Sequence, residues 1–424
     1  MKVLIYGLNF APELTGIGKY SGDMALWLKE QGHDVRVVTA PPYYPEWQVR
    51  PGYESRRYRR EVWKNISVWR SPLWVPKVPT GLKRIIHLLS FALTSLPLML
   101  RQTAWRPDIV LTVAPAFVCA PTGWLIAKLS RARAWLHLQD FEIDVAFSAG
   151  LMKGQRRKGV ILWFERHLLR RFDMVSSISN PMVSRLVVKG VDEDRVRLFP
   201  NWVDTGRIRP LVDAGAYREE LGLSPETVVV LFSGSLAGKQ GLMQIPEAAH
   251  RLADHKDIAF VICGDGVMKT KLEAASAALP NLHLLPLQPQ ERMSELLSTA
   301  DIHLLPQSPS AADLVLPSKL TGMLASGRPV IATCHAGSEL HSVVSNCGAV
   351  VPPQDSEALA NAILSLAGDP MARTQLGRSA RVWAETHFER DAILGRMFNG
   401  EDAAISTRIR LPRVDDSEMA DRVA

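Results

Sequence analysis

Short apolar runs alternate with longer amphipathic segments along most of the chain, and this alternation predicts strands separated by helices. Residues 3–8 form the first run, and residues 19–31 follow it with apolar positions at helical spacing. Gly32 ends that segment, and residues 35–39 form the next run. Runs that are apolar throughout suit parallel strands covered on both faces. The opening segment therefore predicts a doubly wound α/β domain with its ligand at the carboxyl ends of the strands.

The same alternation starts again in the second half of the chain, which predicts a second doubly wound domain. Its apolar runs are residues 228–233, 258–263, 282–285 and 301–306, and the helices predicted after them are 356–367, 371–387 and 390–398. Between the halves, a polar stretch with proline at residues 205–215 is typical of an interdomain linker. We divide the chain into a first domain (1–205), a second domain (206–387), a crossing helix (388–400) and a tail without periodicity that we expect to be disordered (401–424).

A glycine-containing loop follows the first predicted strand. Gly16 and Gly18 allow its backbone to approach a ligand closely. With Gly22 they lie one residue away from a dinucleotide fingerprint, so a NAD site is not favoured.

Two lysines in the second domain are candidates for binding phosphate. Lys239 lies in a glycine-rich turn, next to Ser235, that could cradle a phosphate with backbone N–H groups. Lys319 lies in the first turn of a helix whose start, Ser318, we expect to cap it. A helix N-terminus disfavours a lysine unless an anion is bound there. The alternative is an ordinary surface lysine on a core helix.

Acidic residues follow the strand predicted at residues 134–138. Asp140 and Glu142 lie where an α/β enzyme places its substrate contacts, and we take them as candidate catalytic residues. They could equally cap the next helix.

Composition narrows the class of protein. Apolar residues make up 47% and charged residues 22%, as in a folded soluble protein. The four cysteines form no C-x-x-C pair, so neither a zinc site nor a disulfide framework is indicated. We expect no metal and no cofactor. The first residues lack the layout of a signal peptide, so a cytoplasmic location is expected.

Positive charge is concentrated in one part of the first domain. Residues 50–106 contain twelve Lys/Arg and two acidic residues, which indicates an anionic partner. The same part includes the uncharged stretch 85–100, which is shorter than the roughly 20 residues of a membrane span. It is either a buried helix or a helix that also enters a membrane interface. Nucleic acid is not favoured, because no recognition helix or aromatic platform appears.

Several segments resemble the GT-B glycosyltransferases of retaining family 4, in family order over most of residues 1–400. They are residues 32–39, 179–182, 199–204, 234–241, 263–266, 300–306 and 325–333. Residues 6–13, 139–142 and 316–321 resemble the colanic-acid-type subgroup, which is usually assigned as a fucosyltransferase. The resemblance implies two Rossmann-like domains facing across a cleft, with a C-terminal helix that packs back on the N-terminal domain.

The resemblance also implies roles for the candidate residues. A nucleoside-diphosphate sugar, with GDP-fucose the best single guess, would place base and ribose near Gly264, Gly266 and Leu287. Its diphosphate would meet Lys239, Lys319 and the helix starting at Ser318, without a metal. The loop with Gly16 and Gly18 would close over the donor. Asp140 and Glu142 would meet a polyprenyl-diphosphate-linked glycan at the inner membrane surface.

The sequence departs from the family at two places. The second glutamate of the family's Glu-x₇-Glu pair is Gly322 here, and the first is Leu314. The arginine usual in the first loop of the second domain is Ser235. Two alternatives stay open: a nucleotide-sugar epimerase, which shares the two-domain fold, and a non-catalytic subunit that binds a nucleotide sugar, which the missing glutamates suggest.

Overall fold

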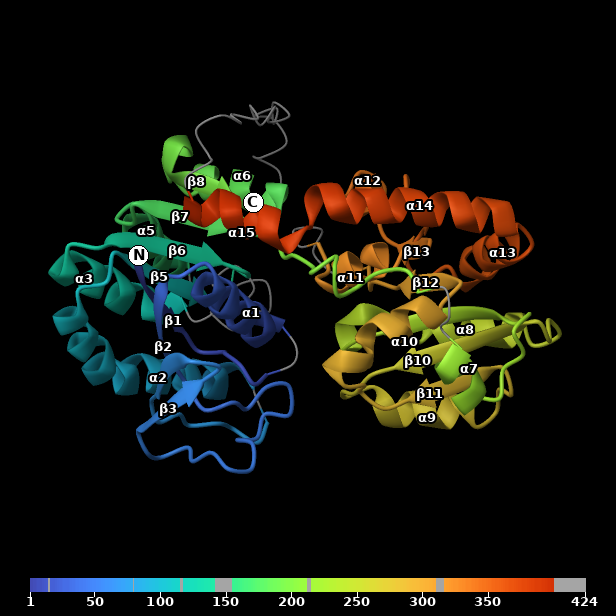
Figure 1. Ribbon diagram of the computed structural model, residues 1–424, viewed down its shortest axis with the longest axis horizontal. Helices are drawn as coiled ribbons and strands as arrows, with labels where there is room; N and C mark the ends of the chain where they lie inside the picture. Colours follow the sequence, from blue (N-terminus) through green and yellow to red (C-terminus); the bar gives the residue numbers. More distant parts are fainter. Residues whose placement is uncertain are drawn as a thin grey trace.

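The computed structural model describes residues 1–13, 16–78, 80–114, 117–141, 155–211, 215–309 and 316–399, apart from the side chains of 155–158 and 239. Two α/β domains lie side by side, and the chain returns from the C-terminal domain to the N-terminal domain (Figure 1). The prediction of two doubly wound domains is confirmed. The predicted tail lies outside the described residues, and the domain limits stay predictions.

An eight-stranded sheet forms the centre of the N-terminal domain, in the order β3-β4-β2-β1-β5-β6-β7-β8. Neighbouring strands are parallel except for β3 and β4. The order reverses between β1 and β5, so the loops after these strands border a crevice at the carboxyl edge. The strands are β1 (Lys2–Gly7), β2 (Asp34–Thr39), β3 (Arg59–Trp63), β4 (Ile66–Arg70), β5 (Ile109–Ala114), β6 (Arg133–Leu138), β7 (Met174–Ser177) and β8 (Val196–Leu198).

Helices cover both faces of this sheet because its central strands are apolar on both sides. Helices α1 and α15 cover one face, in a core that includes Trp27 and Trp135. Helices α2, α3, α5 and α6 cover the other face, around Phe91 and Phe172. Their bounds are α1 (Gly16–Glu30), α2 (Gly81–Gln102), α3 (Ala120–Ser130), α5 (Gln155–Leu169), α6 (Asn180–Val188) and α15 (Arg390–Asn399).

The C-terminal domain is built around a six-stranded parallel sheet, in the order β11-β10-β9-β12-β13-β14. Here the order reverses between β9 and β12. The strands are β9 (Val228–Ser233), β10 (Ile258–Cys263), β11 (Leu282–Leu285), β12 (Ile302–Leu305), β13 (Val330–Thr333) and β14 (Gly348–Val351). The helices are α7 (Gly215–Glu220), α8 (Gln244–Arg251), α9 (Lys269–Ser276), α10 (Met293–Thr299), α11 (Lys319–Ala325), α12 (Glu339–Val344), α13 (Ser356–Ala367) and α14 (Pro370–His387).

The C-terminal helix α15 packs on the N-terminal domain, as predicted. The ring of Phe398 lies against those of Trp27 and Trp135, with centroid distances of 6.4 and 5.0 Å. The two connections between the domains also touch each other. Val203 N donates to Phe388 O at 2.8 Å, and Arg390 N donates to Val203 O at 3.0 Å. The outward and returning segments therefore run side by side.

One local prediction was wrong, and one hairpin was missed. Gly16 and Gly18 lie in the first turn of α1 and not in the loop before it. The hairpin of β3 and β4 was not predicted, because its stretch is rich in proline and arginine. Its turn residues Lys64 and Asn65 both have positive φ, at 45° and 62°, which matches the twist of a two-residue hairpin.

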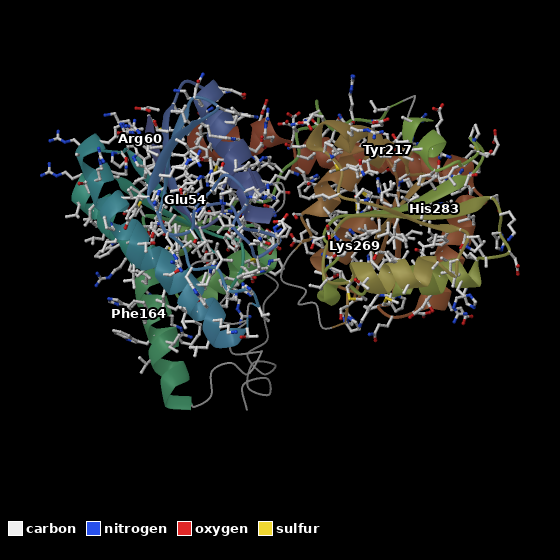
Figure 2. All side chains as sticks on the ribbon, turned by 90° about the horizontal axis from the view of Figure 1, so that it is seen from below. Glu54, Arg60, Phe164, Tyr217, Lys269 and His283 are labelled. Atoms are coloured by element: carbon white, nitrogen blue, oxygen red, sulfur yellow. The ribbon has the colours of Figure 1, made fainter. Side chains whose placement is uncertain are left out.

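Helix α2 extends the predicted segment 85–100 at both ends and carries two different stripes. His87, Phe91 and Met99 lie on the buried side. The opposite stripe is apolar but exposed, and consists of Leu82, Ile86, Leu89, Leu93 and Leu100. Viewed from below, α2 runs across the N-terminal domain (Figure 2). The helix is thus part of the core and also presents an apolar surface.

Candidate functional site

Lys319 lies at the point where the strand order of the C-terminal sheet reverses. Its Nζ donates to Gln240 Oε1 at 2.8 Å and lies 4.1 Å from the ring centroid of Phe232, at the end of β9. A Cβ added at Gly234 would lie 3.4 Å from this Nζ. Since ligands of doubly wound sheets bind at such reversal points, the ammonium group faces the expected ligand position.

Burial lowers the pKa of Lys319 to about 7. The cause is its half-buried position against Phe232 and the turn at Gly234, where water hydrates the charged form poorly. A bound diphosphate would restore the charged form, because an anion within about 4 Å favours protonation. The lysine is therefore suited to bind an anion with proton uptake near neutral pH.

The loops after β9 and β10 are packed directly against each other through glycines. A Cβ at Gly264 would collide with the carbonyl oxygen of Gly234, and one at Gly266 would lie 2.7 Å from Leu236 O. Gly266 also has φ of +150°. These glycines are therefore required for packing, whether or not they contact a nucleotide as the resemblance implies.

The predicted cap at Ser318 is wrong. Helix α11 begins at Lys319, and the Ser318 side chain makes no capping hydrogen bond. Ser318 has helical dihedrals, φ −60° and ψ −22°, whereas a capping side chain needs an extended backbone. Lys319 and the turns around it thus remain as the candidate diphosphate contacts, and the Lys239 side chain lies outside the described residues.

The N-terminal domain approaches this site with helix α1. Tyr20 Oη donates to Ser318 O at 3.3 Å, which joins α1 to the start of α11. Burial raises the pKa of Tyr20 to about 12, so the phenol stays protonated and can donate. A second contact joins the domains, because Asn180 Nδ2 donates to Glu339 Oε1 at 3.1 Å. Ser318, which precedes Lys319, therefore lies at the interface of the two domains.

Known families match both halves of the chain. The sequence model of the glycosyl transferase 4-like domain matches residues 15–202, and that of glycosyl transferases group 1 matches residues 213–383. The chain is 42% identical over 409 residues to WcaI of Escherichia coli strain K12, which is named as a colanic acid biosynthesis glycosyl transferase. That match covers 94% of this chain and 99% of the relative. This chain belongs to the GT-B glycosyltransferases of family 4.

Solved structures agree with this glycosyltransferase in fold. Sucrose-phosphate synthase of Thermosynechococcus elongatus has a TM-score of 0.72 at 17% identity, covering 95% of this chain and 100% of that chain. HepE of Anabaena, solved in complex with UDP-glucose, has a TM-score of 0.67 at 16% identity, covering 94% and 99%. At these identities the likeness shows the fold alone.

The acceptor-side candidates of the glycosyltransferase lie after β6. Asp140 is half-buried there, next to Phe141, whose buried ring anchors the loop in the core. Glu142 lies outside the described residues. Burial lowers the pKa of the nearby His137 to about 3, so its ring is neutral and is a core side chain. The roles of Asp140 and Glu142 stay predictions.

The remaining donor candidates lie at the same edge of the glycosyltransferase's second sheet. Ser235 is half-buried in the turn after β9. Leu287 follows β11 and is 37% exposed. The carboxyl ends of β9, β10 and β11 are adjacent in the sheet, so these residues lie along one side of the Lys319 position. Their contacts with a nucleotide stay predictions.

A buried carboxyl group under the first loop was missed by sequence reasoning. Glu13 is 3% exposed, and its Oε1 accepts from the backbone N–H groups of Tyr43 and Tyr44, both at 3.1 Å. Its Oε2 accepts from Asn9 Nδ2 at 3.0 Å. A Cβ at Gly18 would lie 2.7 Å from Glu13 Cβ, so glycine is needed above this side chain. The one signal was an acidic residue within an otherwise uncharged loop.

The Glu13 carboxyl group predicts an unusual pH dependence of stability. Burial raises its pKa to about 7, against 4.5 when exposed. The folded state then binds more protons between pH 4.5 and 7, so the free energy of unfolding falls as pH rises through this window. We expect Glu13→Gln to remove a loss of about 2–3 kcal/mol between pH 5 and pH 8, since each pKa unit corresponds to ~1.4 kcal/mol.

Denaturant unfolding of wild type and Glu13→Gln at several pH values measures this pH dependence of the free energy of unfolding. The exposed Glu30 on the same helix-and-loop segment provides the control, and Glu30→Gln should follow wild type at every pH. Parallel stability curves for wild type and Glu13→Gln would contradict the assignment.

Proposed function

We propose that this glycosyltransferase moves a sugar from a nucleoside-diphosphate sugar to a lipid-linked oligosaccharide in colanic-acid-type exopolysaccharide biosynthesis. GDP-fucose is the best single candidate for the donor, from the resemblance to the subgroup assigned as fucosyltransferases. The observation that carries the proposal is Lys319, an ammonium group held at the reversal point of the C-terminal sheet, directly after Ser318, which Tyr20 of the other domain contacts. The 42% sequence identity to a relative named for colanic acid biosynthesis supports a role in exopolysaccharide biosynthesis.

In this proposal Lys319 stabilises the charge that develops on the departing nucleoside diphosphate. A preorganised cation in a partly dry site is more effective than the same charge in water. Transfer proceeds with retention of configuration and without a metal. Asp140, at the carboxyl edge of the other sheet, positions the acceptor hydroxyl group. Gly322 leaves the ribose without the glutamate of other family members.

A lipid-linked acceptor requires the enzyme to work at a membrane surface, and we propose that it binds there peripherally from the cytoplasm. Among the described residues, only Gly81–Trp105 is long and apolar enough to cross a membrane by length and composition. Its inner stripe, however, is part of the domain core. The outer stripe of α2 is exposed and apolar, and includes Leu89 and Leu93. Basic residues lie near both ends of the helix, Lys83 and Arg101. Both features support a position of α2 on an anionic membrane surface.

The donor proposal is tested by titrating the purified enzyme with GDP, UDP, ADP, dTDP and CDP, followed by turnover with sugars of the nucleotide that binds. We expect one diphosphate to bind in the micromolar range and its sugar conjugate to be consumed, with or without EDTA. Binding without any turnover would favour the non-catalytic subunit, for which the missing glutamates are the motive. Conversion of the donor sugar without an acceptor would favour the epimerase.

Membrane association is tested by substitutions on the exposed apolar stripe of α2. Replacing Leu89 and Leu93 together by Asp should reduce co-flotation with vesicles containing anionic lipid at least fivefold, because two buried leucines contribute roughly 3–6 kcal/mol at full burial. Val267 is 83% exposed on the C-terminal domain, so Val267→Asp is the matched control and should float like wild type. Equal flotation of all three proteins would refute the surface assigned here.

A further inference from the structure

A groove of about 940 Å³ lies in the N-terminal domain, away from Lys319. It runs between the loop after β2, the loop after β4 and one side of α2. Trp47 and Trp74 provide aromatic walls, and Ser90 and Thr94 provide the α2 side. This volume is within the range of binding sites for small organic ligands.

The walls of the groove are held in place by hydrogen bonds between the loops and the helix. Trp74 N donates to Ser90 Oγ at 3.1 Å, and Thr94 Oγ1 donates to Pro72 O at 2.6 Å. Tyr58 Oη donates to Thr94 O at 2.9 Å. The groove is therefore formed before any ligand arrives.

Trp47 has a backbone conformation that costs free energy. Its φ is +52°, in the left-handed region that a bulky side chain rarely adopts. The indole packs against the rings of Tyr43 and His87, at centroid distances of 5.6 and 5.3 Å. Such strain is maintained by surrounding contacts and is concentrated at ligand sites.

Charge at the groove favours an anion. Arg56 and Lys77 line it, both exposed, and neither forms an ion pair with a described residue. The acidic side chain in the lining, Glu46, is paired with Arg50 at 3.5 Å. Two cations therefore remain available beside the aromatic walls.

The groove continues into the exposed apolar stripe of α2. At 3.6 residues per turn, Ser90 and Thr94 fall between the buried side, with Phe91, and the outer stripe, with Leu89 and Leu93. An elongated ligand can thus have a polar part in the groove and an apolar part along the stripe. Leu93 is 71% exposed, so this stripe is accessible.

The Trp47 wall of the groove belongs to the same segment as the residues that bind Glu13. Trp47 lies three residues after Tyr44, whose N–H binds Glu13 and whose ring is the neighbour of Gly16. Trp47 also packs against Tyr43, whose N–H donates to Glu13, so this wall of the groove borders the contacts of Glu13.

We propose that this groove binds the anionic lipid head of the acceptor: the diphosphate at Arg56 and Lys77, the first sugar against Trp47 and Trp74, and the first isoprene units along the outer stripe of α2. The assignment rests on the proposed function in taking a polyprenyl-diphosphate-linked glycan as acceptor. Sugar rings have an apolar face that suits an aromatic wall, and a diphosphate suits two cations. The lipid is thus bound at a site separate from the donor diphosphate at Lys319.

The probe for this site is farnesyl diphosphate, compared with farnesol and with inorganic diphosphate, by calorimetry on the full chain. We expect farnesyl diphosphate to bind at least tenfold more tightly than either fragment. The double variant Arg56→Ala/Lys77→Ala should weaken it at least tenfold, and Trp74→Ala about fivefold. Arg57→Ala, at an exposed neighbour outside the groove lining, should bind within twofold of wild type.

Nucleoside-diphosphate affinity, measured on the same samples, shows that each variant is folded. Unchanged farnesyl diphosphate binding in both groove variants, or equal binding of inorganic diphosphate alone, would overturn the assignment. If the groove variants lose farnesyl diphosphate affinity as expected but the enzyme turns over no nucleotide sugar, the proposed function is wrong and the assignment of the groove as a lipid-diphosphate site stands. If sugar transfer to a lipid acceptor occurs and is unchanged in Trp74→Ala and in the double variant, the assignment of the groove is wrong and the proposed function stands.

Discussion

Lys319→Met is expected to lower the affinity for the bound nucleoside diphosphate about a hundredfold, and to reduce sugar transfer at least as much. A hydrogen bond to a charged group contributes roughly 1.5–3 kcal/mol, and a hundredfold change corresponds to about 2.7 kcal/mol. Methionine keeps the contact with Phe232 while removing the charge, so the fold should be retained. Isothermal calorimetry measures the change directly.

The pH dependence of the same binding reaction gives a second readout. Because the pKa of Lys319 is lowered to about 7, the free lysine is charged below pH 7 and mostly neutral at pH 8. Binding at pH 8 should then take up a proton, and affinity should fall as pH rises from 6 to 8 more steeply in wild type than in Lys319→Met. Comparing the two proteins cancels the titration of the nucleotide itself. Lys271→Met, at an exposed lysine on α9, should behave as wild type. Identical pH profiles for wild type and Lys319→Met would contradict the role.

Leu394→Asp should destabilise the N-terminal domain by more than 4 kcal/mol. Leu394 is fully buried on α15, in the core shared with Trp27 and Trp135, and an unpaired carboxylate there has no partner to offset its dehydration. At about 2–4 °C per kcal/mol, the transition should fall by about 10 °C. Thermal unfolding followed by tryptophan fluorescence measures it.

Ala392→Asp is the control for this change, since Ala392 is exposed on the same helix. It should unfold within about 2 °C of wild type. If the two variants unfold together, α15 contributes nothing to the N-terminal domain, and the packing of Phe398 against the two tryptophans would have no energetic weight.

The architecture could be predicted from the sequence because buried parallel strands appear in it as continuous apolar runs. Three strands of the C-terminal sheet were predicted to the residue, since each is a mainly apolar run that starts after a polar residue and ends before glycine or proline; they are Val228–Ser233, Ile258–Cys263 and Leu282–Leu285. The β3–β4 hairpin has no such apolar run. β3 is largely exposed at the sheet edge, and β4, although mostly buried, is a short strand in which Ser67 and Arg70 interrupt the apolar residues, so no apolar run marks either strand.

Site residues were harder to predict because their properties depend on neighbours far along the chain. Lys319 could be selected as a phosphate contact, but its enclosure by Phe232 and Gln240 arises from a loop about 80 residues earlier. Ser318 matched the chemistry of a cap, but its own dihedrals exclude that bond. Glu13 was not selected at all, since its partners Tyr43 and Tyr44 follow a different strand.

The two chain crossings between the domains limit how the domains can move relative to each other. Val203 and the segment Phe388–Arg390 are joined by backbone hydrogen bonds, so the outward and returning chains cannot slide past each other without breaking them. Bending both chains together requires only changes in backbone dihedrals on either side of the joint. The angle between the domains can thus vary while their lateral alignment is kept. Lys319 and the loops at the carboxyl edge of the N-terminal sheet would then keep the same lateral register whenever the angle between the domains changes.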